Sequence, residues 1–86
     1  RPALGEVFGD DVGFVLRRDP DTVRAPDAAF VRADRWPVRE RDAGYLELAP
    51  DLAVEGLSPN DRVYEVSEEV AEYLSAGTTI VWVVLP

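Results

Sequence analysis

Residues 52–85, "LAVEGLSPNDRVYEVSEEVAEYLSAGTTIVWVVL", predict one helix between two strands. The apolar runs 52–57 and 79–85 are short, which is typical of buried strands. Between them, apolar side chains recur at the spacing of one helix face: Val63, Val66, Val70, Tyr73 and Leu74. Two strands joined through one helix by short links form a βαβ unit, so we expect these strands to be parallel.

The ends of this helix carry typical capping residues. Asn60 or Asp61 is expected to cap its N-terminus, because short polar side chains accept hydrogen bonds from the free N–H groups there. Gly77 stands where a helix C-terminus takes a left-handed residue. Ser58 is expected to cap the helix or to close the turn that leads into it.

Upstream of residue 22 the sequence indicates a hairpin followed by a turn. The β-type runs "GEVFG" (5–9) and "GFVLRR" (13–18) are separated by Asp10 and Asp11, which predicts that the two runs pair. Residues 19–22, "DPDT", predict a turn, because Pro restricts φ and Asp bonds locally to the backbone.

After that turn, residues 23–33 return to an extended pattern, which Pro26 interrupts as it would at a strand edge, a bulge or a strand start. Residues 34–50 predict an irregular connecting loop. We therefore expect residues 1–86 to form a single α/β (α+β) domain. Its mixed sheet has an antiparallel meander that leads into the parallel crossover, with the helix packed on one face.

The composition restricts the chemistry that the chain can carry out. The 86 residues contain neither Cys nor His, so disulfides, thiolate nucleophiles and histidine bases are excluded. The net charge is −8, and all nine basic residues are Arg. An acidic chain is a poor electrostatic match for nucleic acid, so we interpret the arginines as part of a solvated surface rather than as a phosphate track.

The sequence also suggests where the protein works and how complete the chain is. No signal peptide or membrane-spanning run is recognisable, so a cytoplasmic protein is expected. The chain lacks an initiating Met and ends in an apolar run, so we expect it to be a segment of a longer protein.

Glu55 and Asp27 are the candidate functional residues. Glu55 interrupts an apolar strand, and an ionised carboxylate is costly to bury unless it is paired. Asp27 opens the apolar run 28–31, so both carboxylates stand at strand ends and could converge on a divalent cation. The alternative is that Glu55 points outward or pairs with an arginine such as Arg24.

Three stretches resemble the Uma-two type of restriction-endonuclease-like domain, within the PD-(D/E)XK nuclease superfamily. They are "VRAPDAAFVRADRWP", "GYLELAPDLAVEGLSPNDRVYEV" and "EYLSAGTTIVWVVLP". The resemblance implies a restriction-endonuclease-like core and a Mg²⁺ or Mn²⁺ cofactor. It implies that Asp27, Glu55 and the carbonyl of Gly56 are metal ligands. It also implies that further segments precede and follow residues 1–86.

Position 69 departs from the pattern of that family. The family's Lys, four residues before the Tyr of the helix, corresponds here to Glu69. In the superfamily this Lys orients or deprotonates the attacking water and stabilises charge on the phosphate. Arg62 lies on the same helix face but about 10 Å away along the axis, so it is a poor replacement. Gly56, where the family often has a branched apolar residue, is a milder departure.

Three functions follow as alternatives. The first is a Mg²⁺- or Mn²⁺-dependent DNA endonuclease in which Asp27, Glu55 and Glu69 are the catalytic residues, Glu69 acting as a base or as an extra ligand. The second is a degenerate relative that serves as a metal-binding or protein-interaction module. The third is a structural role, in which an exposed sheet edge pairs with another copy as a homodimer or with further parts of the parent protein. Trp82 and Tyr73 are expected in the core, and Trp36 is expected to anchor a loop.

Overall fold

The computed structural model describes residues 4–35, 40–42 and 44–85 of the chain. They form two four-stranded sheets, one α-helix and one 3₁₀ turn, η1 (Ala33–Arg35). Trp36, expected as a loop anchor, lies outside the described residues. Among the described residues, no helix is long and apolar enough to cross a bilayer.

The first sheet, sheet A, contains the predicted crossover. Its strand order is β1-β4-β7-β8, and its strands are β1 (Gly5–Phe8), β4 (Ala28–Arg32), β7 (Leu52–Gly56) and β8 (Ile80–Val84). β4 is antiparallel to β1 and β7, whereas β7 and β8 are parallel and are joined through α1 (Val63–Ser75). The prediction of an α/β fold in which an antiparallel part leads into a parallel βαβ unit is therefore confirmed.

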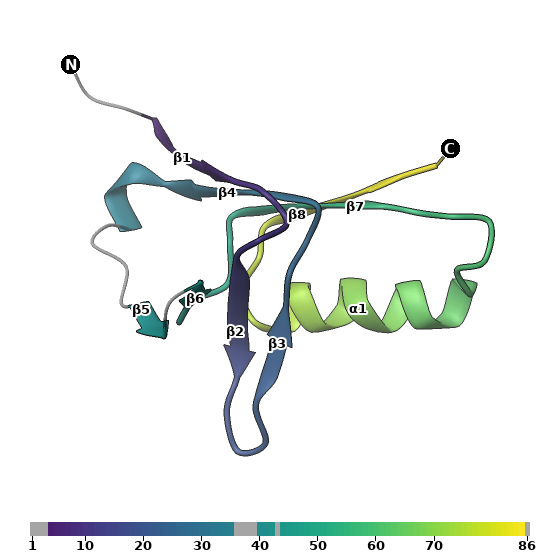
Figure 1. Cartoon of the computed structure of the whole chain (residues 1–86), viewed down its shortest axis with the longest axis horizontal. Coiled ribbons are helices and arrows are strands. Elements are labelled where there is room, and N and C mark those ends of the chain that lie inside the picture. Colours follow the sequence, from purple (N-terminus) through teal and green to yellow (C-terminus); the bar gives the residue numbers. More distant parts are fainter. Residues whose placement is uncertain (1–3, 36–39, 43, 86) are drawn as a thin grey trace.

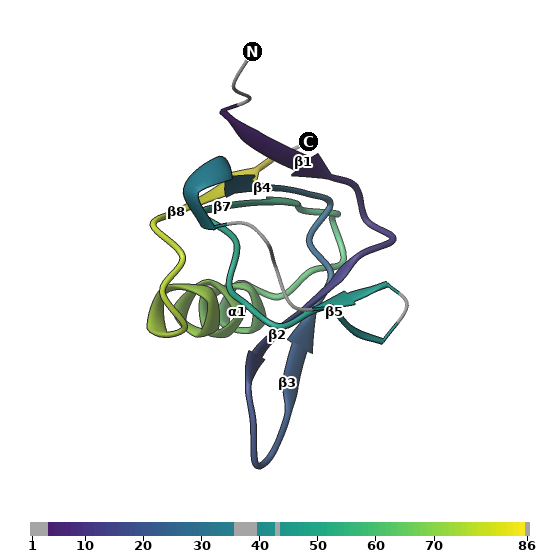
Figure 2. The ribbon, with the colours of Figure 1, turned by 90° about the vertical axis from the view of Figure 1, so that its left-hand side faces the viewer.

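The second sheet, sheet B, was not predicted as a separate sheet. Its strand order is β3-β2-β6-β5, and its strands are β2 (Gly13–Arg17), β3 (Thr22–Arg24), β5 (Glu40–Asp42) and β6 (Tyr45–Leu46). β2 is antiparallel to β3 and parallel to β6, and β5 is antiparallel to β6. In Figures 1 and 2, sheet B and α1 lie side by side beneath the same face of sheet A.

The predicted hairpin between residues 5–9 and 13–18 is wrong. β1 pairs with β4 in sheet A, whereas β2 pairs with β3 in sheet B. The physical reason is the turn that follows β2, where Asp19 adopts a left-handed conformation with φ of 55°. Asp tolerates that conformation, so the chain reverses direction at this turn and β3 pairs with β2.

The irregular loop predicted for residues 34–50 is also partly wrong, because it contains β5 and β6. Gly44, at φ of +86°, makes the turn between these strands, and its carbonyl accepts a hydrogen bond from the Gly13 N–H at 2.7 Å. A glycine takes this left-handed conformation without the steric cost that a Cβ imposes. Strands of two or three residues are too short to leave a recognisable alternation in the sequence.

The core of the protein lies between the two sheets. Ala29 and Val31 of β4 pack against Phe14 of β2 and Leu46 of β6, and all four side chains are buried. The rings of Phe14 and Phe8 meet edge to face with centroids 5.8 Å apart, an arrangement that aromatic pairs prefer. A second buried contact lies between sheet A and α1, where Ala53 and Tyr73 are fully buried, as predicted for Tyr73.

The two ends of α1 differ from each other in how well they were predicted. At the C-terminus, Gly77 is left-handed (φ +110°), and the N–H groups of Gly77 and Thr78 donate to the carbonyls of Leu74 and Tyr73. This is a Schellman motif, as Gly77 predicted. At the N-terminus, Arg62 is the cap residue and no side chain caps the helix.

The predicted capping by Asn60 or Asp61 is therefore wrong. The Asp61 carboxylate instead accepts a hydrogen bond from the Ser58 N–H at 2.7 Å, and the Asp61 N–H donates to the Ser58 carbonyl at 3.1 Å. A local turn of this kind competes for the same side chain that would cap the helix. Ser58 thus closes the turn into the helix, which is one of its two predicted roles.

The prediction that residues 79–85 form a fully buried strand is wrong as well. Among the described residues, β8 is an edge strand of sheet A, with β7 on one side. Trp82, expected in the core, is 57% exposed, and Ile80 and Val84 are exposed beside it. Alternation along the strand directs these three side chains to the face of sheet A that α1 and sheet B leave uncovered (Figure 2).

Candidate functional site

Strand pairing brings Asp27 and Glu55 to the same end of sheet A. β4 and β7 are antiparallel with Ala28 opposite Val54, so Asp27 and Glu55 are the next residues along each strand. The Asp27 carboxylate accepts a hydrogen bond from the backbone N–H of Gly56, with Oδ2 and N 2.6 Å apart. This bond places the Asp27 side chain beside the residue that follows Glu55.

Gly56 permits this close approach. A Cβ built at position 56 would lie 3.1 Å from Asp27 Oδ2, which is tighter than an ordinary van der Waals contact. The absence of a side chain at this strand end therefore leaves room for the carboxylate. A branched side chain at this position would require Asp27 to shift by a few tenths of an ångström.

Glu55 is half-buried rather than fully buried, and its partner is a tyrosine. The Tyr73 hydroxyl of α1 donates to Glu55 Oε2 at 3.1 Å. Burial raises the pKa of the Glu55 carboxyl, the hydrogen bond from Tyr73 lowers it, and the charges of Glu69 and Asp27 raise it further. Burial and the Glu55 charge raise the pKa of Tyr73, so its hydroxyl stays protonated and remains a donor.

This hydroxyl contact was not predicted from the sequence. A buried Tyr hydroxyl usually finds a polar partner, and Glu55 is the charged residue of the strand against which the helix packs. A Tyr within a helix face otherwise made of Val and Leu was therefore the available signal.

Glu69 contacts an arginine rather than the two other carboxylates. Its Oε2 lies 3.8 Å from Nη1 of Arg24, which comes from β3. Within residues 4–35, 40–42 and 44–85, no group of three or more acidic side chains is arranged to share one metal ion. In the described residues, Glu69 is thus a partner of Arg24 and does not stand as a third metal ligand beside Asp27 and Glu55.

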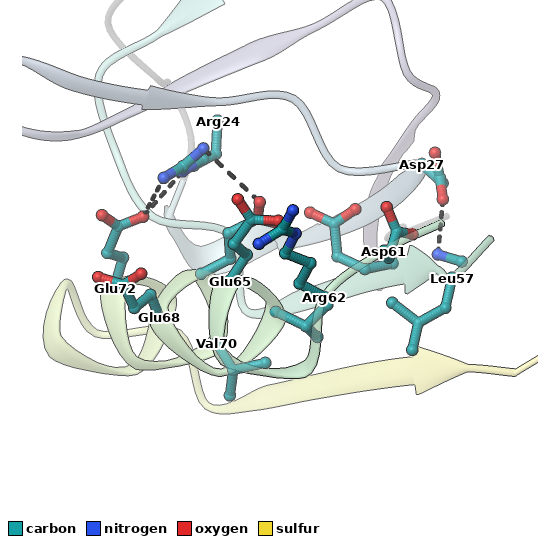
Figure 3. Close-up of a pocket in the computed structure, with 13 residues that line it drawn as sticks. Arg24, Asp27, Leu57, Asp61, Arg62, Glu65, Glu68, Val70 and Glu72 are labelled. Atoms are coloured by element: carbon teal, nitrogen blue, oxygen red, sulfur yellow. Dashed lines mark hydrogen bonds and ion pairs between the residues drawn. The ribbon is translucent and has the colours of Figure 1, made fainter. Parts of the chain in front are cut away.

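Arg24 pairs mainly with Glu72. The alternative drawn from the sequence, a pair between Arg24 and Glu55, is therefore not what the structure has. Its Nε donates to Glu72 Oε1 at 2.8 Å, and its Nη2 lies 2.7 Å from the same oxygen (Figure 3). Arg24 also lowers the pKa of Glu55 through its charge, without a direct bond. The cleft region therefore contains a positively charged side chain, Arg24, and this side chain comes from β3 of sheet B rather than from the helix.

These side chains line one open cleft of about 520 Å³ between α1 and the ends of β3, β4 and β7 (Figure 3). Among the described residues, the lining has two guanidinium groups, Arg24 and Arg62. It has seven carboxylates, which are Asp27, Glu55, Asp61, Glu65, Glu68, Glu69 and Glu72. A lining of this balance attracts cations and opposes the approach of a phosphate.

The donor set fits a hard divalent cation. Asp27 and Glu55 supply two carboxylates on paired strands, and Gly56, whose carbonyl the resemblance implies as a third ligand, bonds to Asp27 through its N–H. Mg²⁺ is commonly bound by one or two carboxylates with water in its other positions, and Mn²⁺ accepts similar ligands. Burial, together with the charges of Glu69 and Asp27, raises the pKa of the Glu55 carboxyl, and a cation bound beside it would favour the ionised form.

The fold places the protein in the class of restriction-endonuclease-like α/β domains. The chain belongs to the Uma2 family, described as "Putative restriction endonuclease", which matches it over residues 1–86. No protein with a curated description matches it.

A solved structure supports the same class. It is a crystal structure described as a putative nuclease belonging to DUF820 from Anabaena variabilis ATCC 29413. The two chains share 26% sequence identity with a TM-score of 0.72, over 96% of this chain and 45% of the other. The present chain thus corresponds to less than half of that protein's length.

Proposed function

We propose that this protein is a metal-dependent nuclease that hydrolyses phosphodiester bonds in DNA. The observation that carries the proposal is the pairing of β4 with β7. This pairing places the Asp27 carboxylate on the backbone N–H of Gly56, next to Glu55, inside one cleft. Membership of the Uma2 family and the nuclease-like neighbour support the same chemistry.

Asp27, Glu55 and the Gly56 carbonyl would hold Mg²⁺ or Mn²⁺. When bound, such an ion supplies a more acidic water molecule and stabilises negative charge on the phosphate oxygens. Hydrolysis forms one P–O bond to the oxygen of water and breaks one P–O ester bond, and the proton of water passes to the leaving oxygen or to solvent.

Two residues of the chain prepare the carboxylates for this role. Tyr73 donates to Glu55 Oε2 and so restrains that carboxylate, which leaves Oε1 for a further ligand. The Gly56 N–H restrains Asp27 in the same way through Oδ2. Both donors come from regular elements, α1 and β7, so these hydrogen bonds would position the two carboxylates for a metal ion.

A second candidate function is metal binding without cleavage. The specific observation in its favour is the lining of the cleft, where carboxylates outnumber guanidinium groups and Glu69 stands at the position of the family's Lys. Such a cleft favours a divalent cation and disfavours a DNA backbone. The protein would then be a degenerate family member that binds metal or another protein.

Plasmid nicking by the full-length protein in Mg²⁺ or Mn²⁺ distinguishes the two functions. We expect nicking by the wild type and none by Asp27→Ala, because the latter loses one of the two carboxylate ligands. Manganese binding, measured on the same samples by calorimetry, separates loss of metal from loss of chemistry.

Glu69→Lys completes the comparison. Silence in the wild type with nicking in Glu69→Lys would support the degenerate relative, since one residue then restores the missing cation. Silence in all three proteins, with no manganese binding, would exclude DNA cleavage and metal binding and would leave only the binding of another protein.

A further inference from the structure

One edge of the Arg24 guanidinium is fixed on the helix. Nε and Nη2 both contact Glu72 Oε1, at 2.8 and 2.7 Å, so these two groups direct one side of the planar fork toward α1 (Figure 3). A guanidinium has five N–H donors, and one carboxylate oxygen cannot satisfy all of them. Donors on the other edge are left for a different acceptor.

That other edge meets Glu69 loosely. Nη1 lies 3.8 Å from Glu69 Oε2, which is longer than a hydrogen bond, and each of the two side chains is 36% exposed. Exposed ion pairs of this length contribute little to stability. Glu69 is therefore a partner that an incoming anion can displace from Nη1 without breaking the contact between Arg24 and Glu72.

The position of Arg24 also suits a ligand of the metal site. It precedes Asp27 by three residues at the end of β3, and both line the same cleft as Glu55. Its charge acts on Glu55 without a direct bond between them. An anion bound near Asp27 and Glu55 would lie within the field of Arg24.

We propose that Arg24 contacts a phosphate of the DNA backbone through its Nη1 edge, and that Glu69 competes with this phosphate for the same edge. The inference rests on the proposed function, because the anion is the phosphodiester on which the metal site would act. It assigns to β3 the positive charge that the family's Lys supplies from the helix, and it makes Glu69 a competitor of the substrate.

The first test measures the affinity of the full-length protein for a short labelled DNA duplex by fluorescence anisotropy, in Ca²⁺ and over a series of salt concentrations. Arg24→Gln should weaken binding about tenfold, as expected for loss of a charged hydrogen bond. The slope of log affinity against log salt should fall by about 0.9, the value for one phosphate contact. Arg62→Gln, which removes the same charge from the same cleft, should weaken binding by no more than about threefold and leave the slope unchanged.

The second test uses Glu69→Gln with Glu68→Gln as its matched control, since both remove one negative charge from the cleft. Glu69→Gln should strengthen DNA binding about fivefold when Arg24 is present and no more than about twofold in an Arg24→Gln background. Glu68→Gln should have the same small effect in both backgrounds. Additive effects of Arg24→Gln and Glu69→Gln would overturn the competition between phosphate and Glu69.

Two further results would overturn the proposal: unchanged affinity and salt slope in Arg24→Gln, or no DNA binding by the wild type. Arg24→Lys keeps the charge but not the fork, so it should retain the slope. If Arg24→Gln lowers the melting temperature, the comparison of Glu69→Gln with Glu68→Gln decides alone. If the wild type nicks DNA and Arg24→Gln binds DNA as tightly as the wild type, the proposed function stands and the Arg24 contact is excluded. If DNA binding depends on Arg24 but no nicking occurs, the Arg24 contact stands and cleavage is excluded.

Discussion

The two faces of sheet A differ in what covers them and in what they carry. One face lies against α1 and sheet B and presents the buried Ala29, Val31 and Ala53 together with Glu55. On the other face, strand register aligns Val7, Phe30, Leu52 and Ile80 in one row, and Val54 and Trp82 in the next. Val7 is 73% exposed and Trp82 is 57% exposed.

This difference shows that the number of apolar residues in a strand does not predict which of its two faces is buried. The covered face presents small buried residues where sheet B and α1 pack on it, and it presents Glu55 where the cleft opens. The uncovered face has the larger aliphatic and aromatic side chains. A strand such as β8 therefore looks buried in the sequence although most of its side chains are exposed in the described chain.

The largest expected difference between the faces is in stability. Phe14→Ala should lower the free energy of unfolding by about 3–5 kcal/mol, because Phe14 is fully buried against sheet A. Trp82→Ala should lower it by no more than about 1 kcal/mol, because more than half of that side chain is already exposed. Urea denaturation of the full-length protein measures both values. A loss for Trp82→Ala equal to that for Phe14→Ala would show that the outer face of sheet A is covered.

A smaller difference is expected in metal affinity, between two neighbouring residues that point to opposite faces. Glu55→Ala should weaken Mn²⁺ binding about 100-fold, because it removes a carboxylate ligand. Val54→Ala should leave the affinity unchanged, since Val54 lies in the outer row beside Trp82. Calorimetric titration with Mn²⁺ checks the pair, and equal affinities in the two variants would exclude Glu55 as a ligand.

The smallest expected effect concerns the contact between α1 and the carboxylate of the inner face. Tyr73→Phe keeps the buried ring and removes the donor to Glu55, so it should cost about 1 kcal/mol of unfolding free energy. It should also weaken Mn²⁺ binding by less than Glu55→Ala does, because the ligand itself remains. Thermal unfolding and the same titration measure these effects. A stability equal to that of the wild type would mean that the hydroxyl contact contributes nothing.

The predictable parts of the fold are those with local causes. The stripe of Val63, Val66, Val70 and Tyr73 has the period of a helix, and Gly77 stands where a left-handed residue ends it. Short links on both sides of that helix leave a parallel crossover as the available connection. The two-sheet arrangement was not predictable, because β2 had two candidate partners and β5 and β6 are too short to show a pattern.

The candidate site also has a part that was predictable from the sequence and a part that was not. Asp27, Glu55 and the departure at Glu69 are visible in the sequence, because each is a charged residue set against an apolar or family pattern. The sequence offered Arg24 as a possible partner of Glu55, but its contact with Glu72 and the contact of the Tyr73 hydroxyl came only from the structure, because they span 48 and 18 residues along the chain. Such contacts depend on how sheet B and α1 pack beneath sheet A.

By itself, therefore, the sequence determined the crossover, the helix end at Gly77 and the two carboxylates at strand ends, since each follows from spacing or from backbone restrictions within a few residues. Only the tertiary structure decided that Arg24 is the cation beside Glu69 and that Trp82 lies on an uncovered face. Charge pairing and burial depend on which elements pack together, and that packing joins residues whose separation along the chain leaves no local signal.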